Sequence, residues 1–315
     1  MCNDSRPAVT TAQSPFDDPN ADIILHTSDH VDFRIFRLIL TLSSPFFQGM
    51  FSLPQPTADA PRSTTNNPND TQVSQSQTTT NGPPSIDVPE DSQTLDTLLR
   101  FLYPNTHTPS FHGLVHAHNV ALAASKYDMP IALDKIANKV EAQYVSTHPL
   151  HVYLIACRMG WEPVARAAAA YCLDPDRMPR EELDGDTMLR SSDAGVAYHR
   201  LQTYREACRR ALETKLDDMD LFLDEESCES ESDGDVHGGI SGRCLSRWTA
   251  QYLANIKIAL LKCPRKDALD NFDLVPLGDC TRCYIDKAHA IATARSQVAT
   301  ELKDALSNVR CNVYD

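Results

Sequence analysis

The chain has 315 residues, a hydrophobic fraction of 42% and a formal net charge of −14. Such a length holds about two domains of ordinary size, and the apolar content is sufficient for a sizeable core. The negative charge argues against a protein that binds nucleic acids or anionic membranes in general. No run approaches the roughly 18 apolar residues that a membrane-spanning helix needs.

The first 20 residues are polar and contain prolines, and they lack the basic start and apolar run of a secretory signal. We therefore predict a disordered tail over residues 1–20. Ten cysteines are spread along a chain without such a signal, so we expect reduced thiols and a location in the cytoplasm or the nucleus.

The stretch from Ala21 to Phe51 contains the pattern around which the rest of the chain is organised. Residues 22–27 form a run of β-branched and large apolar side chains, which is typical of a strand. Residues 28–32 are polar and favour a turn. Residues 33–37 then predict a second strand, so the stretch opens with a hairpin.

Two short helices are expected after this hairpin. Residues 38–42 carry enough apolar side chains for a buried helix. Ser43 or Ser44 is suited to cap the next helix, with Pro45 at its first position. The broad apolar face of that helix consists of Phe46, Phe47, Met50 and Phe51.

A polar segment, residues 52–84, follows these helices. It has no aromatic residue and is rich in Pro, Ser, Thr, Asn and Gln, so it cannot bury enough apolar area to offset the entropy of ordering it. We interpret it as a disordered insert within one domain, because residues 85–89 predict another strand of the same fold. Ser92 is the expected cap of the next helix, and Pro104 ends it. Two more helices are predicted over residues 114–130 and 131–145.

The order of these elements resembles the opening of the BTB/POZ domain, in which an Asp-led strand and a turn precede two short helices. The matching positions are Asp22, Phe33, Ile35, Arg37, Leu40, Ser43, Ser44, Phe47 and either Met50 or Phe51. The chain departs from the family pattern at Phe36, where the family usually has His. Pro104 and the long polar insert resemble fungal proteins of this family.

The resemblance implies an α+β fold, in which a small BTB/POZ-like sheet flanked by helices spans residues 21–145. A mainly α-helical C-terminal region is predicted to follow, with Gly160 between two of its helices. The predicted parts are a helical extension at 146–216, an acidic disordered loop at 217–242 and a helical region at 243–315. The loop begins with the run from Asp217 to Asp235, which has ten Asp and Glu and no Lys or Arg.

Cys280 and Cys283 form a C-x-x-C pair, which is a weak indication of structural zinc because a closed site needs four ligands. The other ligands would come from Cys244, Cys263, Cys311 or His289. Unligated thiols and redox use are the alternatives, and no cofactor is predicted. A second group, His112, His116 and His118, lies near a predicted helix start. We expect exposed polar side chains there, because no carboxylate or Cys accompanies them.

No sequence pattern nominates a catalytic centre. The chain has no phosphate-cradling loop, nucleophile elbow, H-E-x-x-H motif or kinase motif. It also has no Cys/His finger repeats and no basic stripe of the kind that reads DNA. We therefore predict that the protein is not an enzyme and not a DNA-reading factor.

The predicted function is a non-enzymatic protein-interaction module that associates with itself or with another BTB protein. The resemblance places Asp22 and Arg37 at the acidic and basic positions that face each other in the dimer groove of the family. An intrachain ion pair that supports the fold is the alternative. The further contact candidates are Phe46, Phe47, Met50 and Phe51, with core packing as the alternative for most of them.

Some proteins of the family bridge substrates to a cullin-type ubiquitin ligase, so a cullin scaffold is a further expected partner by analogy. Neither nucleic acid nor a membrane is expected as a partner. Two other hypotheses compete with the interaction module. In one, the C-terminal half is a zinc-stabilised helical domain with its own binding or catalytic role. In the other, the BTB-like domain is monomeric and structural only.

Overall fold

The computed structural model describes residues 9–53, 82–104, 109–178 and 192–220. Nearer the C-terminus it describes residues 254–264 without 256, then 296, 299–301 and 303–313. Most of the predicted insert and of the predicted acidic loop, together with Cys280 and Cys283, lies outside the described residues. The chain divides into two units, Met1–Lys139 and Val140–Asp315.

One four-stranded sheet lies in the first unit, with the strand order β1-β3-β2-β4. Its strands are β1 (Thr10–Thr11), β2 (Ile23–His26), β3 (Val31–Ile35) and β4 (Ser85–Asp87). β2 and β3 form an antiparallel hairpin, while β1 pairs in parallel with β3 and β4 in parallel with β2. The prediction that the first strands share a sheet with residues 85–89 is therefore confirmed.

Buried and half-buried side chains alternate along the hairpin, and this alternation shows which face of the sheet lies against the core. Ile23, Leu25, Phe33 and Ile35 are at most 2% exposed, whereas the residues between them are half-buried. Leu25 lies opposite Phe33 in the register, so the buried side chains of both strands share one face. β3 begins at Val31, two residues before the predicted strand, because the connecting turn is shorter than the predicted polar stretch.

Residues 9–20 form an ordered N-terminal arm, which corrects the prediction of a disordered tail for this part of the chain. The backbone N–H of Thr10 donates to the carbonyl of His30 at 3.0 Å, so the arm pairs along the outer edge of β3. Phe16 is fully buried, with its ring 5.5 Å from Phe33 and 5.1 Å from Tyr103. One buried aromatic side chain thus anchors a polar segment.

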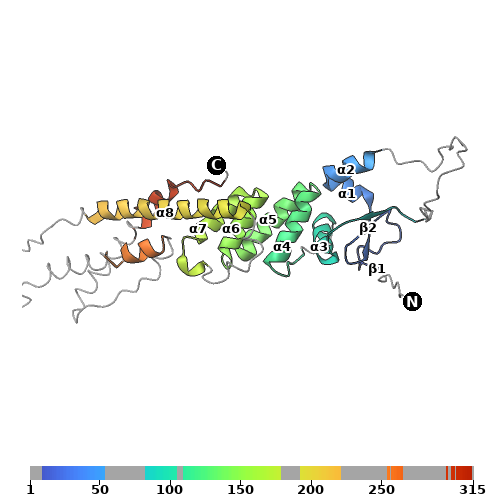
Figure 1. Cartoon of the computed structure of the whole chain (residues 1–315), viewed down its shortest axis with the longest axis horizontal. Helices are drawn as coiled ribbons and strands as arrows, with labels where there is room; N and C mark the ends of the chain where they lie inside the picture. Colours follow the sequence, from blue (N-terminus) through green and yellow to red (C-terminus); the bar gives the residue numbers. More distant parts are fainter. Residues whose placement is uncertain are drawn as a thin grey trace, which may run out of the picture. The chain divides into compact units, whose positions relative to one another are not determined.

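Five helices complete the described part of this domain, and the last of them crosses the boundary between the two units. They are α1 (Arg37–Ser43), α2 (Pro45–Ser52), α3 (Ser92–Leu102), α4 (Leu114–Lys126) and α5 (Pro130–Tyr144). α1 packs against α2, and α3 packs against α4 (Figure 1). Ser52 belongs to α2, so the predicted insert begins one residue too early.

Side-chain caps set the starts of two of these helices. Ser44 Oγ accepts the backbone N–H of Phe47 at 3.1 Å, which confirms Ser44 as the cap of α2 ahead of Pro45. At α3 the cap is Asp91, whose Oδ1 accepts the N–H of Thr94 at 2.7 Å. The prediction of Ser92 as that cap is wrong by one residue, because an Asp stands immediately before it.

The second unit is helical where it is described. Its elements include α6 (Pro149–Met159), α7 (Glu162–Tyr171), a short 3-10 turn (Pro175–Arg177) and α8 (Ser192–Asp220). Both α7 and α8 pack against α6 (Figure 1). Gly160 follows α6 in the left-handed conformation with φ 75°, as its predicted place between two helices requires. α8 extends to Asp220, so the acidic run starts within a helix rather than in a loop.

The C-terminal segment returns to α8. The Arg200 side chain donates from Nη1 to the backbone carbonyl of Val313 at 2.9 Å. Cys311 and Val313 are buried, at 7% and 3% exposure. The segment therefore contributes to the core of the second unit.

Candidate interaction surface

The most exposed apolar side chains of α1, of α2 and of the residue that follows α2 form the candidate site, which we name the α1–α2 face. It consists of Leu38, Leu42, Phe46 and Leu53, which are 66%, 75%, 48% and 63% exposed. Leu38 and Leu42 are four residues apart and share one side of α1. Because α1 packs against α2, two neighbouring helices turn large apolar side chains outward.

Phe47 does not belong to this face, which corrects its assignment as a contact residue. It is 1% exposed, and its ring lies 5.8 Å from that of Phe51 and 5.2 Å from that of Tyr127. Because α2 packs this side chain inward, only the opposite side of the helix remains for contact. Met50 and Phe51 are half-buried, intermediate between the buried Phe47 and the exposed Phe46.

Asp22 and Arg37 meet through the backbone of Arg37. Its N–H donates to Asp22 Oδ1 at 2.6 Å. Since α1 begins at Arg37 and its own cap residue, Phe36, accepts no such bond, the carboxylate serves as the acceptor at this helix start. Among the described contacts of these two residues, none joins the carboxylate to the guanidinium, so the predicted intrachain ion pair is not what links them.

The Arg37 side chain has a different neighbour. Its guanidinium carbon lies 4.4 Å from the centroid of the Phe51 ring, within the range of a cation–π contact. This contact holds Arg37 over the end of α2. The positive charge of Arg37 therefore lies against α2.

A hydrogen-bonded group fixes α2 to the end of α4. Ser44 Oγ donates to the carbonyl of Tyr127 at 2.5 Å, and the Tyr127 hydroxyl donates to Glu90 Oε2 at 2.5 Å. Lys126 forms an ion pair with Glu90 at 2.9 Å. Burial raises the pKa of the Tyr127 phenol, and its bond to Glu90 raises it further, so the phenol stays protonated as a donor. The ring of Phe46 lies 5.8 Å from that of Tyr127.

Leu38, Leu42 and Leu53 were not among the residues predicted from the sequence. Residues 38–42 were expected to form a buried helix, yet only Leu40 of α1 is buried. The four-residue spacing of Leu38 and Leu42 indicates that they share one side of a helix. It does not indicate that this side is exposed, because the sequence of a helix of two turns does not show which side faces the core.

A pocket of about 380 Å³ lies between the starts of α3 and α4 and is lined by Asp91, His112, His116 and neighbouring residues. The backbone N–H of His112 donates to His116 Nδ1 at 3.2 Å, and burial lowers the pKa of His116. His118 is 6% exposed, which corrects the expectation that all three histidines of this group are exposed. In the part of the chain that is described, no group of three or more His, Cys, Asp or Glu side chains could hold a metal ion.

Several described cysteines lie in the helical unit as free thiols, and three of them, Cys172, Cys208 and Cys311, are buried. Burial raises the pKa of Cys172 to about 12, which keeps this thiol neutral. Zinc binding by Cys280 and Cys283 stays a prediction, because both lie outside the described residues.

The hairpin, the strand after the insert and the succession α1 to α5 reproduce the order of elements expected from the resemblance. Residues 15–144 match the family model of the BTB/POZ domain. The match begins next to Phe16 of the N-terminal arm and ends with the last residue of α5, so the BTB/POZ domain starts six residues before the predicted boundary at 21. A comparison with curated proteins found no match.

This match indicates a general function for residues 15–144, and the finer points stay predictions. A BTB/POZ domain is a protein-interaction domain, and such domains are typically non-enzymatic. The fold class is α+β, as predicted. The fungal type and the long polar insert stay predictions.

Among the helices of the described residues, none combines the length and the apolar character that crossing a bilayer requires.

Proposed function

We propose that the BTB/POZ domain of this chain binds a second copy of itself through the α1–α2 face. The observation that carries the proposal is the exposure of its four apolar side chains, between 48% and 75%. Exposed apolar patches on a monomer are typical of interaction sites. Since full burial of one such side chain is worth about 1.5–3 kcal/mol, covering the face would provide several kcal/mol toward association.

A second copy is the favoured partner because a two-fold interface uses the same face on both subunits. An apolar face can pack against itself without charge repulsion. Charged groups of both signs lie near its residues, with Arg37 over Phe51 of α2 and the Glu90–Lys126 pair beside Tyr127, whose ring is 5.8 Å from that of Phe46. The resemblance supports the same choice, since the first helices of the family commonly make dimers and Asp22 and Arg37 match its groove positions.

Light scattering on the intact chain after size-exclusion chromatography tests this proposal. We expect the mass of a dimer for the parent and the mass of a monomer for Leu42→Glu, because the new carboxylate would have to be buried in the interface. Ile131→Glu is the matched control: Ile131 is 59% exposed, on α5 and outside the α1–α2 face. This control should remain a dimer.

Two results would contradict the proposal. One is a monomeric parent over the whole accessible concentration range. The other is an equal loss of dimer in Leu42→Glu and Ile131→Glu, since a general effect of added charge would then explain both. Circular dichroism of each variant establishes that the fold is retained.

A cullin-type scaffold extends the proposal to a hetero-complex. It rests on the family resemblance and on the paired helices α6 and α7, which follow the BTB/POZ domain as expected for such adaptors. Affinity purification of the intact chain should then recover a cullin. Recovery of no cullin would remove this extension and leave the self-association proposal standing.

A further inference from the structure

The turn between β2 and β3 brings two histidines together, away from the residues of the α1–α2 face. His26 is the last residue of β2, and His30 lies in the turn before β3. His26 Nε2 and His30 Nδ1 are 3.4 Å apart. This is long for a hydrogen bond between nitrogen and its acceptor, which is usually about 2.9–3.0 Å.

Asp32 determines which nitrogen of His26 faces His30. Asp32 lies opposite His26 in the β2–β3 register, and its Oδ1 is 2.6 Å from His26 Nδ1. A contact this short is typical of an N–H group donating to a carboxylate. The proton on Nδ1 leaves the lone pair of Nε2 directed to the side of His30. Carboxylates hold metal-binding histidines in this tautomer in the same way.

The backbone of the turn is held in place independently of the two rings. Thr27 and Val31 exchange hydrogen bonds across it, and the N–H of His30 donates to the carbonyl of Thr27 at 3.0 Å. His30 itself has φ 64°, a left-handed conformation that this closed turn imposes. Asp29 fixes the turn to α3, since its carboxylate accepts the N–H of Ser92 at 2.9 Å. The two rings are therefore carried by a pre-organised loop.

The separation of the two nitrogens fits a shared metal ion. A zinc ion lies about 2.0–2.1 Å from each imidazole nitrogen, and tetrahedral geometry then places the two nitrogens roughly 3.3–3.4 Å apart. We propose that His26 Nε2 and His30 Nδ1 form a two-histidine site for a divalent transition metal ion, with Zn²⁺ as the first candidate and Asp32 as the positioning residue. Imidazole ligands suit zinc, copper and nickel.

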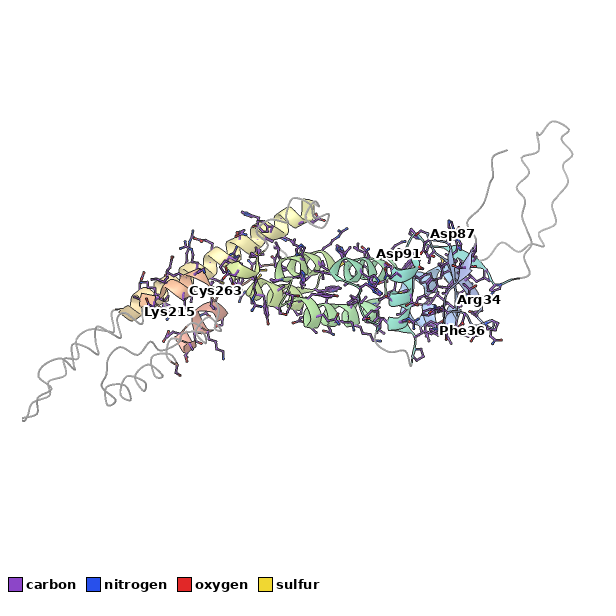
Figure 2. All side chains as sticks on the ribbon, turned by 90° about the horizontal axis from the view of Figure 1, so that it is seen from below. Arg34, Phe36, Asp87, Asp91, Lys215 and Cys263 are labelled. Atoms are coloured by element: carbon purple, nitrogen blue, oxygen red, sulfur yellow. The ribbon has the colours of Figure 1, made fainter. Side chains whose placement is uncertain are left out.

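The open coordination positions would be filled by water, so the site is weaker than a closed four-ligand zinc site. This agrees with the finding that no three described side chains form a metal-binding group. Asp87 of β4 (labelled in Figure 2) lies beside His26 in the register of the parallel pair and is exposed. Its charge favours a cation near the site without being a required ligand.

His112 and His116 provide an internal comparison. They have the same four-residue spacing, and their ring centroids are 5.1 Å apart, close to the 5.6 Å of His26 and His30. Nδ1 of His116 already has a partner, however, because it accepts the backbone N–H of His112 at 3.2 Å. This pair is therefore not free to share an ion.

Calorimetric titration of the full chain with zinc chloride tests the proposal. The parent should carry Cys280→Ser and Cys283→Ser, so that the other predicted zinc ligands do not contribute. We expect this parent to bind one ion at the turn, and the added pair His26→Gln with His30→Gln to lose at least roughly tenfold in affinity. The matched pair His112→Gln with His116→Gln should bind as the parent does. Asp32→Asn should weaken binding by roughly 10–100-fold, as is usual for such positioning groups.

Unchanged zinc binding after replacement of His26 and His30, or an equal loss in the His112 and His116 variant, would overturn the proposal. If the first variant does not fold, nuclear magnetic resonance of the histidine rings in the unsubstituted turn replaces it. Zinc should then shift the Nε2 signal of His26 and the Nδ1 signal of His30. The absence of both shifts at saturating zinc would equally overturn it.

Discussion

Two helical stretches of this chain are similarly rich in apolar residues and bury them very differently. In α6, Leu150, Tyr153 and Ile155 are at most 1% exposed, because α7 and α8 pack against that helix. In α1, Leu38 and Leu42 are 66% and 75% exposed. The difference lies in the number of elements that cover each helix and not in its composition.

The comparison separates two uses of apolar surface. Side chains covered within the chain stabilise the fold, and their loss raises the fraction of unfolded protein. Side chains left outside contribute little to the folded monomer and become useful when a partner covers them. α6 is thus a helix of the first kind, and α1 and α2 carry side chains of the second kind beside the buried Leu40 and Phe47.

The largest expected effect is that of Leu150→Ala. Leu150 is fully buried, so its truncation leaves a cavity and should lower the free energy of unfolding by about 2–5 kcal/mol. Leu42→Ala should change it by less than about 0.5 kcal/mol, because Leu42 is largely exposed. Urea unfolding followed by circular dichroism checks both, at a concentration where the parent is monomeric. Equal losses of unfolding free energy in the two variants would contradict the distinction between the buried helix α6 and the exposed side of α1.

A smaller effect is expected at Ser44, which is fully buried between α2 and the end of α4. Ser44→Ala removes the cap of α2 and the bond to the Tyr127 carbonyl, and it should cost about 1–3 kcal/mol. Ser52→Ala is the control, because its hydroxyl bonds to the Gly49 carbonyl at the exposed end of α2. Thermal unfolding measures both. A loss in Ser44→Ala no larger than the control would show that this buried bond does not hold α2.

The smallest effect is confined to alkaline pH and to the helical unit. Burial raises the pKa of Cys172 from 9.0 to about 12, so the folded state retains a proton that the unfolded state releases. The stabilising contribution is therefore complete below pH 9 and is lost as the pH rises toward 12. Between pH 8 and 11, Cys172→Ala should lose less unfolding free energy than the parent.

Thr203→Ala is the control for this alkaline measurement, because Thr203 is exposed on α8 and carries no group that titrates between pH 8 and 11. Its loss of unfolding free energy between pH 8 and 11 should follow that of the parent. If Cys172→Ala follows the parent as well, the buried thiol does not account for the alkaline loss.

Much of the BTB/POZ domain could be predicted from sequence because its signals are local. Alternation of apolar side chains marks β2, and Pro45 marks the start of α2. The N-terminal arm could not be predicted, since Phe16 is a single aromatic residue in a polar segment and its partners, Phe33 and Tyr103, are distant in sequence. The predicted cap of α3, Ser92, differs from the observed cap by one residue, because Asp91 and Ser92 are equally suitable acceptors.

The candidate surface was predicted in part. The sequence does not separate the exposed Phe46 from the buried Phe47, because two adjacent aromatic residues on a short helix give no periodicity to distinguish inside from outside. Asp22 and Arg37 are neighbours through the backbone N–H of Arg37, and their role in a dimer groove stays a prediction. The role of the Asp22 carboxylate at the start of α1 depends on backbone geometry, which a sequence pattern does not contain.

The described arm, residues 9–20, also has a practical consequence for the design of shortened versions of this protein. A version that starts at Ala21 would lack the arm that pairs with β3. The N–H and C=O groups at that edge of β3 would then be free to pair with strands of other molecules. It would also lose Phe16 and leave a hollow between Phe33 and Tyr103. Truncations that are meant to crystallise should therefore retain residues 9–20.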